Sequence, residues 1–310
     1  MRKVSHRLKV KPRPTVGQLL ERGRRRLARA RLHYGHGTDN PRDDAAALLR
    51  HALRLRPRAT ISLRARVAAG PCSAFEQLLA RRIRERIPVV YLTKRCWFAG
   101  LTMYVDQRVL IPRSPIAELV QRRFEPWVSA ARVQRILDLG TGSGCIAIAC
   151  ARAFPAARVD AVDISTDALA VARINIRRHR LSRRVRALRS DHFTGLGKRS
   201  YDIIVSNPPY VGRGEFAALP AEYRHEPRRA LEAGTDGLDS VRIILREAAA
   251  RLRPGGVLIV EVGNSEAAVR RAFPRLPFVW LAFERGGSGV FLLERDQLLQ
   301  RWAAKQLDVG

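Results

Sequence analysis

The chain has 310 residues, 46% of them hydrophobic and 6% aromatic, so it is long enough to bury a full core. No apolar run approaches the length of a membrane span, and no apolar stretch of a secretion signal follows the basic start at Met1 to Arg7. The net charge of +30 fits a phosphate-bearing partner, but it fits arginine-coated, solvated faces equally well.

The four cysteines, Cys72, Cys96, Cys145 and Cys150, form no C-x-x-C pair, and none has a histidine at metal-ligand spacing. Cys145 and Cys150 lie in an apolar segment that is typical of small buried thiols. The sequence therefore predicts a soluble, cytoplasmic protein that has no metal site and no membrane segment.

Amphipathic helices are predicted between Thr15 and about Leu55, where apolar residues recur at helical spacing among arginines. The segment from Tyr34 to Pro41 is rich in helix breakers and could cap a helix that starts near Pro41. A further helix is predicted over 73–86.

From Cys96 to Pro112 the apolar positions alternate, with a break at Asp106-Gln107. This pattern predicts a β-hairpin that joins two domains. A short helix is expected from Pro115 to Phe124.

After Arg135 strands and helices alternate, which predicts a parallel sheet with helices on both faces. The end, 278–293, instead predicts a β-hairpin and hence an antiparallel last pair of strands. The strands are expected near 135–139, 158–163, 185–189, 201–206 and 257–262. The predicted domains are a basic arm (1–14), a helical substrate-recognition domain (15–95), a hairpin linker (96–114) and an α/β domain (115–310).

A glycine loop closes the first strand of the α/β domain, with Gly140, Gly142 and Gly144 following Asp138. Glycines at such a turn let the backbone approach a ligand closely, but the spacing is not the dinucleotide pattern G-x-G-x-x-G. Asp163 ends the next strand about 20 residues later, where a carboxylate can accept from ribose hydroxyls. Asp191, at the end of the third strand, could meet a base edge. A nucleoside ligand is therefore predicted at the carboxyl edge of the sheet.

A second loop, Asn207-Pro208-Pro209-Tyr210, follows the apolar strand at 201–206. Proline cannot donate to a sheet ladder, so the strand must stop there, and the loop needs another explanation. Together with Asp-Leu-Gly-Thr-Gly-Ser-Gly at 138–144, this loop resembles the seven-stranded class I (Rossmann-like) methyltransferases that use S-adenosylmethionine to modify planar amino nitrogens.

A planar amide nitrogen is a poor nucleophile because its lone pair is delocalised into the carbonyl. Two acceptors on its hydrogens would hold it in line with the methyl group, and orientation of this kind can contribute about 7 to 11 kcal/mol. The Asn207 side-chain oxygen and the Pro208 carbonyl can be those acceptors. Tyr210 would pack against the planar target or face the sulfonium.

Further segments resemble one branch of the protein glutamine methyltransferases, the enzymes that act on the third large-subunit ribosomal protein. They include Tyr34 to Asn40, Val109 to Pro115, Glu222 to Pro227 and Glu261 to Ser265. The resemblance implies methylation of a glutamine amide with S-adenosylmethionine as cofactor. It implies cofactor contacts at Asp138, Gly140, Thr141, Gly142, Ser143, Gly144, Asp163, Asp191 and Asn207, and catalytic or substrate contacts at Asn207, Pro208, Pro209 and Tyr210.

Other functions remain open at this point. The sister enzymes that methylate peptide release factors share the Asn-Pro-Pro-Tyr loop, and methylases of bases in RNA or DNA share both motifs. The arginine surplus favours a nucleic-acid partner, such as ribosomal RNA in an assembly intermediate that contains the ribosomal protein. A cofactor-binding protein without catalysis is the weakest alternative, because the acceptor loop is intact.

Overall fold

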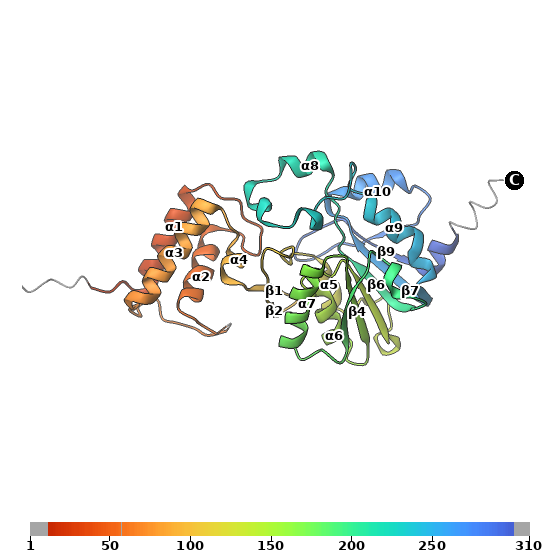
Figure 1. Cartoon of the computed structure of the whole chain (residues 1–310), viewed down its shortest axis with the longest axis horizontal. Coiled ribbons are helices and arrows are strands. Elements are labelled where there is room, and N and C mark those ends of the chain that lie inside the picture. The colour runs from red at the N-terminus through yellow and green to blue at the C-terminus, as the bar shows by residue number, and fades with distance from the viewer. Residues whose placement is uncertain (1–11, 57, 301–310) are drawn as a thin grey trace, which may run out of the picture. The chain divides into compact units, whose positions relative to one another are not determined.

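The computed structural model describes residues 12–56 and 58–300, and the chain divides into two compact units, Met1–Thr93 and Lys94–Gly310 (Figure 1). Most of the predicted basic arm, residues 1–11, lies outside the described residues. Among the described residues, no helix is both long enough and apolar enough to cross a membrane.

The first unit is helical, as the spacing of its apolar residues predicts. Thr15 caps the first helix in a capping box with Gln18, and the side chain of Asn40 caps the second by accepting from the backbone of Arg42 and Asp43. The predicted helix start at Pro41 is therefore confirmed. The helices are α1 (Val16–Arg29), α2 (Pro41–Ala52), α3 (Ala69–Glu85) and α4 (Val89–Thr93).

Helix α3 begins four residues before the predicted start at Ser73. Pro71 lies in its first turn, where the backbone N–H groups have no partner inside the helix, so proline is tolerated there. The helix ends at Glu85, and Arg86 takes a left-handed conformation with φ of 56°.

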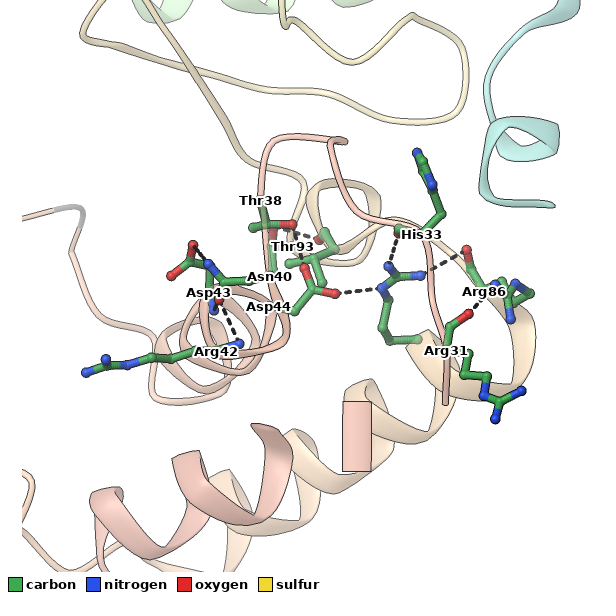
Figure 2. A network of polar contacts seen from close by, with 11 residues as sticks. Arg31, His33, Thr38, Asn40, Arg42, Asp43, Asp44, Arg86 and Thr93 are labelled. Carbon is green, nitrogen blue, oxygen red and sulfur yellow. Dashed lines mark hydrogen bonds and ion pairs between the residues drawn. The ribbon is translucent and has the colours of Figure 1, made fainter. Parts of the chain in front are cut away.

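A buried ion pair joins α2 to α3. The Arg82 Nε donates to Asp44 Oδ2 at 2.8 Å, and both side chains are almost completely buried. Thr38 Oγ1 donates to the other Asp44 oxygen at 2.5 Å, and Arg82 Nη2 donates to the His33 carbonyl at 2.9 Å. Figure 2 shows Asp44 between Thr38 and the guanidinium group, which in turn faces the His33 carbonyl. The pair thus holds the loop before α2 against the helices.

The second unit contains a seven-stranded sheet with the order β5-β4-β3-β6-β7-β9-β8. The first five strands in this order, β5, β4, β3, β6 and β7, are parallel. Strand β9 pairs antiparallel with both β7 and β8, as predicted for the end of the chain. The strands are β3 (Arg135–Leu139), β4 (Arg158–Asp163), β5 (Val185–Arg189), β6 (Tyr201–Ser206), β7 (Leu252–Glu261), β8 (Val279–Trp280) and β9 (Val290–Glu294).

Helices cover both faces of the sheet, with α5, α6 and α7 on one side and α9 and α10 on the other (Figure 1). Successive side chains of a strand point to opposite faces, and β3 is buried on both: Leu137 and Leu139 join the core cluster that contains Val241 and Ile244 of α9. The α-helices are α5 (Ile116–Gln121), α6 (Cys145–Ala153), α7 (Thr166–Arg178), α8 (Arg213–Ala218), α9 (Asp239–Glu247) and α10 (Glu266–Ala272); short 3-10 turns cover Ala130–Arg132, Thr194–Leu196, Ala221–His225, Arg228–Ala230, Ala248–Ala250 and Gly263–Ser265.

The predicted hairpin is shorter than expected. It consists of β1 (Cys96–Phe98) and β2 (Leu101–Met103), and its turn lies at Ala99-Gly100 rather than at Asp106-Gln107. Both turn residues have positive φ, which is the geometry that two-residue hairpins favour. Beyond Met103 the chain leaves the hairpin and makes a turn at Gln107-Arg108, in which the Val109 N–H donates to the Asp106 carbonyl. The Asp106 carboxylate accepts from Tyr104 and Arg108.

Strand β7 begins at Leu252, five residues before the predicted start at 257. The residues Pro254-Gly255-Gly256 lie within the strand, at an irregularity of its pairing with β6. Leu252 pairs with Tyr201 and Val257 pairs with Ile203, so the residues between them bulge out of the ladder.

Candidate active site

The glycine loop runs from the end of β3 into α6. Asp138 is fully buried on the face toward α6, where one oxygen accepts from Thr141 Oγ1 at 2.6 Å and from the Ala147 N–H at 3.0 Å. Burial raises the pKa of Asp138 to about 7, although both hydrogen bonds oppose the shift. Asp138 therefore braces the loop from behind.

Asp163 ends β4 beside this loop. Its carboxylate accepts from the Gly142 N–H at 2.9 Å and from the Ser165 N–H at 2.9 Å, so it ties the glycine loop to the start of α7. Burial raises the pKa of Asp163. Each carboxylate oxygen keeps a second lone pair with which it can accept from a ligand hydroxyl.

Asp191 follows β5 and is the most exposed of these acids, with 61% of its side chain accessible. One of its oxygens lies 2.7 Å from His192 Nδ1. Both residues line the cavity described below.

The Asn-Pro-Pro-Tyr loop follows β6, which lies next to β3 in the sheet. Ser206 Oγ donates to the Leu139 carbonyl at 2.8 Å, and a Cβ on Gly140 would lie 3.8 Å from the Asn207 carbonyl oxygen. Gly140 also has φ of 70°, a left-handed conformation that favours glycine. The two motifs are thus in contact.

A cavity of about 420 Å³ opens at the carboxyl edge of the sheet, at β3, whose neighbours β4 and β6 lie on its opposite sides. This is where parallel sheets bind ligands, and the volume suits a small molecule. Of the residues that the resemblance singles out, Gly140, Gly142, Asp163, Asp191, Asn207, Pro208 and Pro209 line it. Asp138, Thr141, Ser143, Gly144 and Tyr210 are not among its lining residues.

A second cavity, of about 120 Å³, lies on the other side of the loop. Arg113, Tyr210 and Tyr223 are among its lining residues, and it shares Asn207 and Pro208 with the larger cavity. The side-chain oxygen of Asn207 is buried and has no hydrogen-bond partner among the described residues. An unsatisfied acceptor therefore stands where two cavities meet, which is a suitable place to orient an N–H group of a substrate.

Several lining residues escape sequence reasoning. Ile164 follows Asp163 and is 42% exposed, which is unusual for isoleucine, and with Ala168 it offers an apolar surface beside the carboxylate. Its position directly after the acid was the only signal in the sequence. Arg229 and Ala233 also line the cavity, and they belong to the long connection between β6 and α9. No local sequence pattern predicts that this connection folds back to the cavity.

Tyr210 is held from behind by the end of β7. Its hydroxyl donates to Glu261 Oε1 at 3.3 Å, and Ser114 Oγ donates to the other oxygen of the same carboxylate. The ring lies against Gly263, where a Cβ would come within 2.6 Å of a ring carbon, so only glycine fits. Burial raises the pKa of Glu261 to about 7 and also raises the pKa of Tyr210.

Glu261→Gln should remove part of the pH dependence of stability. Because the pKa of Glu261 rises from 4.5 to about 7 on folding, its contribution is present below pH 4.5 and is lost as the pH rises through 7. The wild type should lose roughly 3 kcal/mol from this group between pH 4.5 and 8. Urea unfolding at several pH values checks this. Glu294→Gln, at an exposed acid of β9, should keep the wild-type dependence; equal curves for all three proteins would contradict the assignment.

In the described ranges, no group of three or more His, Cys, Asp or Glu side chains is placed to hold a metal ion. The cavity instead offers what a nucleoside needs: a carboxylate for ribose hydroxyls, apolar side chains for a base, and close backbone at Gly140 and Gly142.

Comparisons with known proteins agree with this geometry. The family model described as "Methyltransferase small domain" matches residues 124–276, and the one described as "PrmC N-terminal domain" matches residues 18–93. A ribosomal protein uL3 glutamine methyltransferase of Francisella tularensis is 45% identical over 87% of this chain and 86% of its own length. Another, of Burkholderia pseudomallei, is 44% identical over 93% of this chain and 96% of its own length. Among solved structures, the catalytic domain of hMettl16 in complex with the MAT2A 3'UTR hairpin 6 has a TM-score of 0.50 at 17% identity, covering 76% of this chain and 86% of that one, and shares the fold.

Proposed function

The chain belongs to the family of ribosomal protein uL3 glutamine methyltransferases, and we propose that it methylates a glutamine side-chain amide of uL3. The cofactor is S-adenosylmethionine, as in the methyltransferases whose fold it shares. The observation that carries the proposal is the buried, unpartnered Asn207 oxygen at the junction of two cavities. The reaction takes place in the cytoplasm, where ribosomal proteins are made and assembled.

The larger cavity is the proposed cofactor site. Asp163 accepts from the ribose hydroxyls, Asp191 faces the base, and Gly140 and Gly142 allow close backbone approach. Asp138, Thr141, Ser143 and Gly144 act indirectly, by fixing the shape of the loop from behind. When bound, S-adenosylmethionine supplies an electrophilic methyl group.

The smaller cavity is the proposed site of the glutamine amide. Asn207 Oδ1 and the Pro208 carbonyl accept its two N–H groups and aim the nitrogen lone pair toward the larger cavity. A bond forms between this nitrogen and the methyl carbon while the bond between sulfur and that carbon breaks, and the extra proton leaves to water. Tyr210 lines only the smaller cavity, which supports packing against the amide rather than contact with the sulfonium.

The helical unit, within the predicted domain at 15–95, is proposed to recognise the protein substrate. Residues 96–114, which belong to the second compact unit, are proposed as the linker to the catalytic domain. An assembly intermediate that contains ribosomal RNA is the proposed setting, since the chain carries a net charge of +30. No metal takes part in the proposed reaction.

The test is peptide mass spectrometry of large-subunit ribosomal proteins after incubation with the purified enzyme and methyl-labelled S-adenosylmethionine. One added methyl group on a glutamine of uL3 is the expected result. Label confined to a release factor would assign the chain to the sister activity. Label that ribonuclease removes and protease does not would contradict protein methylation altogether.

Asp163→Ala should weaken the affinity for S-adenosylmethionine by about 10- to 150-fold, because hydrogen bonds to a charged acceptor contribute about 1.5 to 3 kcal/mol. Isothermal titration calorimetry measures this change. Asp167→Ala, at an exposed acid in the first turn of α7, is the matched control and should bind normally. Unaltered affinity in Asp163→Ala would rule out the ribose contact.

A further inference from the structure

The segment 168–190 of the second unit contains no acidic residue, although it is rich in arginine. It covers most of α7, the turn after it, and β5, which is an edge strand of the sheet. Arg173 Nη2 donates to the Ala187 carbonyl at 3.3 Å, which ties the helix to the strand. We call the arginines of this segment the arginine strip: Arg173, Arg177, Arg178, Arg180, Arg183, Arg184, Arg186 and Arg189.

None of these arginines forms an ion pair with a residue that the structure describes, whereas Arg24 and Arg25 of α1 share Glu21. Three members of the strip have a structural role: Arg173 donates to the Ala187 carbonyl, Arg184 donates to backbone carbonyls, and Arg178 lies over the Tyr104 ring at 4.8 Å. The others are exposed. Like charges gathered without counterions repel one another, so the strip costs stability.

Two ordinary explanations account for part of the strip. Arg177 and Arg178 lie in the last turn of α7, where the helix dipole favours cations. One or two charges on β5 would also protect its open edge from pairing with another chain. Neither explanation covers Arg180 and Arg183, which lie in the turn between the two elements.

The surface around the strip indicates what kind of partner fits. None of the large exposed hydrophobic side chains among the described residues lies in 168–190. A protein interface would need an apolar or aromatic centre, and a membrane surface would need apolar side chains to insert. Guanidinium groups alone match phosphate oxygens, to which they donate in pairs.

We propose that the arginine strip binds the phosphate backbone of RNA. That this RNA is ribosomal rests on the proposed function, whose protein substrate is assembled on ribosomal RNA. Arg189 ends β5 and is followed directly by Ser190 and Asp191, which line the larger cavity. Only the Arg189 end of the strip therefore adjoins the larger cavity, whereas Arg180 and Arg183 lie toward the opposite edge of the sheet. RNA held along the strip tethers the particle to the enzyme, and an amide carried by the same particle is then presented at high local concentration.

The test compares binding of a labelled 20-base-pair RNA hairpin by two triple variants of the full chain. Arg180→Gln/Arg183→Gln/Arg186→Gln removes three exposed cations of the strip, and Arg132→Gln/Arg246→Gln/Arg271→Gln removes three from other surfaces of the same unit. Loss of three phosphate contacts should reduce the steepness of log K against log salt by about two to three, and so weaken binding at 0.1 M salt by about 100- to 1,000-fold, relative to the effect at 1 M salt. The control variant should keep a slope close to that of the wild type. Equal losses in both variants would mean that binding follows net charge alone, and would overturn the proposal.

Two further measurements separate this inference from the methylation itself. The strip variant should methylate free uL3 at the wild-type rate but methylate a uL3-containing RNA particle more slowly. If the wild type binds RNA but does not methylate uL3, the proposed function is contradicted, while the proposal that the arginine strip binds RNA still stands. If polyglutamate displaces the labelled hairpin as effectively as unlabelled RNA of equal charge, the strip would instead bind an acidic protein, and the RNA proposal would be overturned.

Discussion

Asn207→Ala is expected to lower kcat by about 10²- to 10³-fold, the cost typical of removing one preorganised polar group from an active site. Its side-chain oxygen is buried and unpartnered, so the variant removes an acceptor that no described neighbour replaces. The affinity for S-adenosylmethionine should stay nearly unchanged, because the larger cavity keeps its carboxylates and glycines. Single-turnover kinetics with a uL3 peptide and calorimetry with the cofactor measure the two quantities separately.

Asn264→Ala is a matched control for this prediction. Asn264 is also an amide that lines the smaller cavity, but its side chain donates to Glu215 at 3.2 Å on the exposed side. Its loss should alter KM at most. A wild-type kcat in Asn207→Ala, or equal losses of kcat in the two variants, would contradict the acceptor role.

Arg82→Met should lower the free energy of unfolding of the helical unit by about 3 to 5 kcal/mol, because it leaves the Asp44 carboxylate buried without its counterion. Urea unfolding followed by hydrogen exchange in α2 and α3 resolves this unit. Arg26→Met breaks the exposed pair with Glu76 and should cost no more than about 1 kcal/mol.

A double variant distinguishes the loss of a charge partner from the loss of packing. Arg82→Met with Asp44→Leu replaces both ions by apolar side chains of similar size, and it should recover most of the lost stability. If the double variant is as unstable as Arg82→Met, the hydrogen bonds to Thr38 and to the His33 carbonyl are what the unit needs.

Much of the fold could be predicted because local and global preferences agree. The predicted bounds of β3, β4, β5 and β6 match the structure, since each run holds recurring apolar residues and lies in a regular alternation of strands and helices. Errors arise where conformation opposes local preference. Ala99 adopts positive φ in the hairpin turn, and Pro254-Gly255-Gly256 stays within β7 because its neighbours pair on both sides.

The sequence motifs of the candidate site could be predicted, but the contacts that surround and support them could not. Asn207 and Asp163 follow strands, so their common edge could be inferred from topology. The burial of Asp138 could not, because it depends on the approach of α6, nor could the contact of Tyr210 with Glu261, which is 51 residues away. The pairing of Asp44 with Arg82 spans 38 residues and has no local signal.

The position of β9 in the sheet has a consequence for folding during translation. This strand, Val290–Glu294, lies between β7 and β8 in the sheet. The sheet therefore stays incomplete until the ribosome has synthesised β9. A nascent chain that has emerged only as far as Arg285 presents β7 as a bare edge with the apolar run Val257-Leu258-Ile259-Val260. Such an edge invites pairing with other chains. The apolar edge of β7 is therefore covered only when β9, near the end of the described chain, pairs with it.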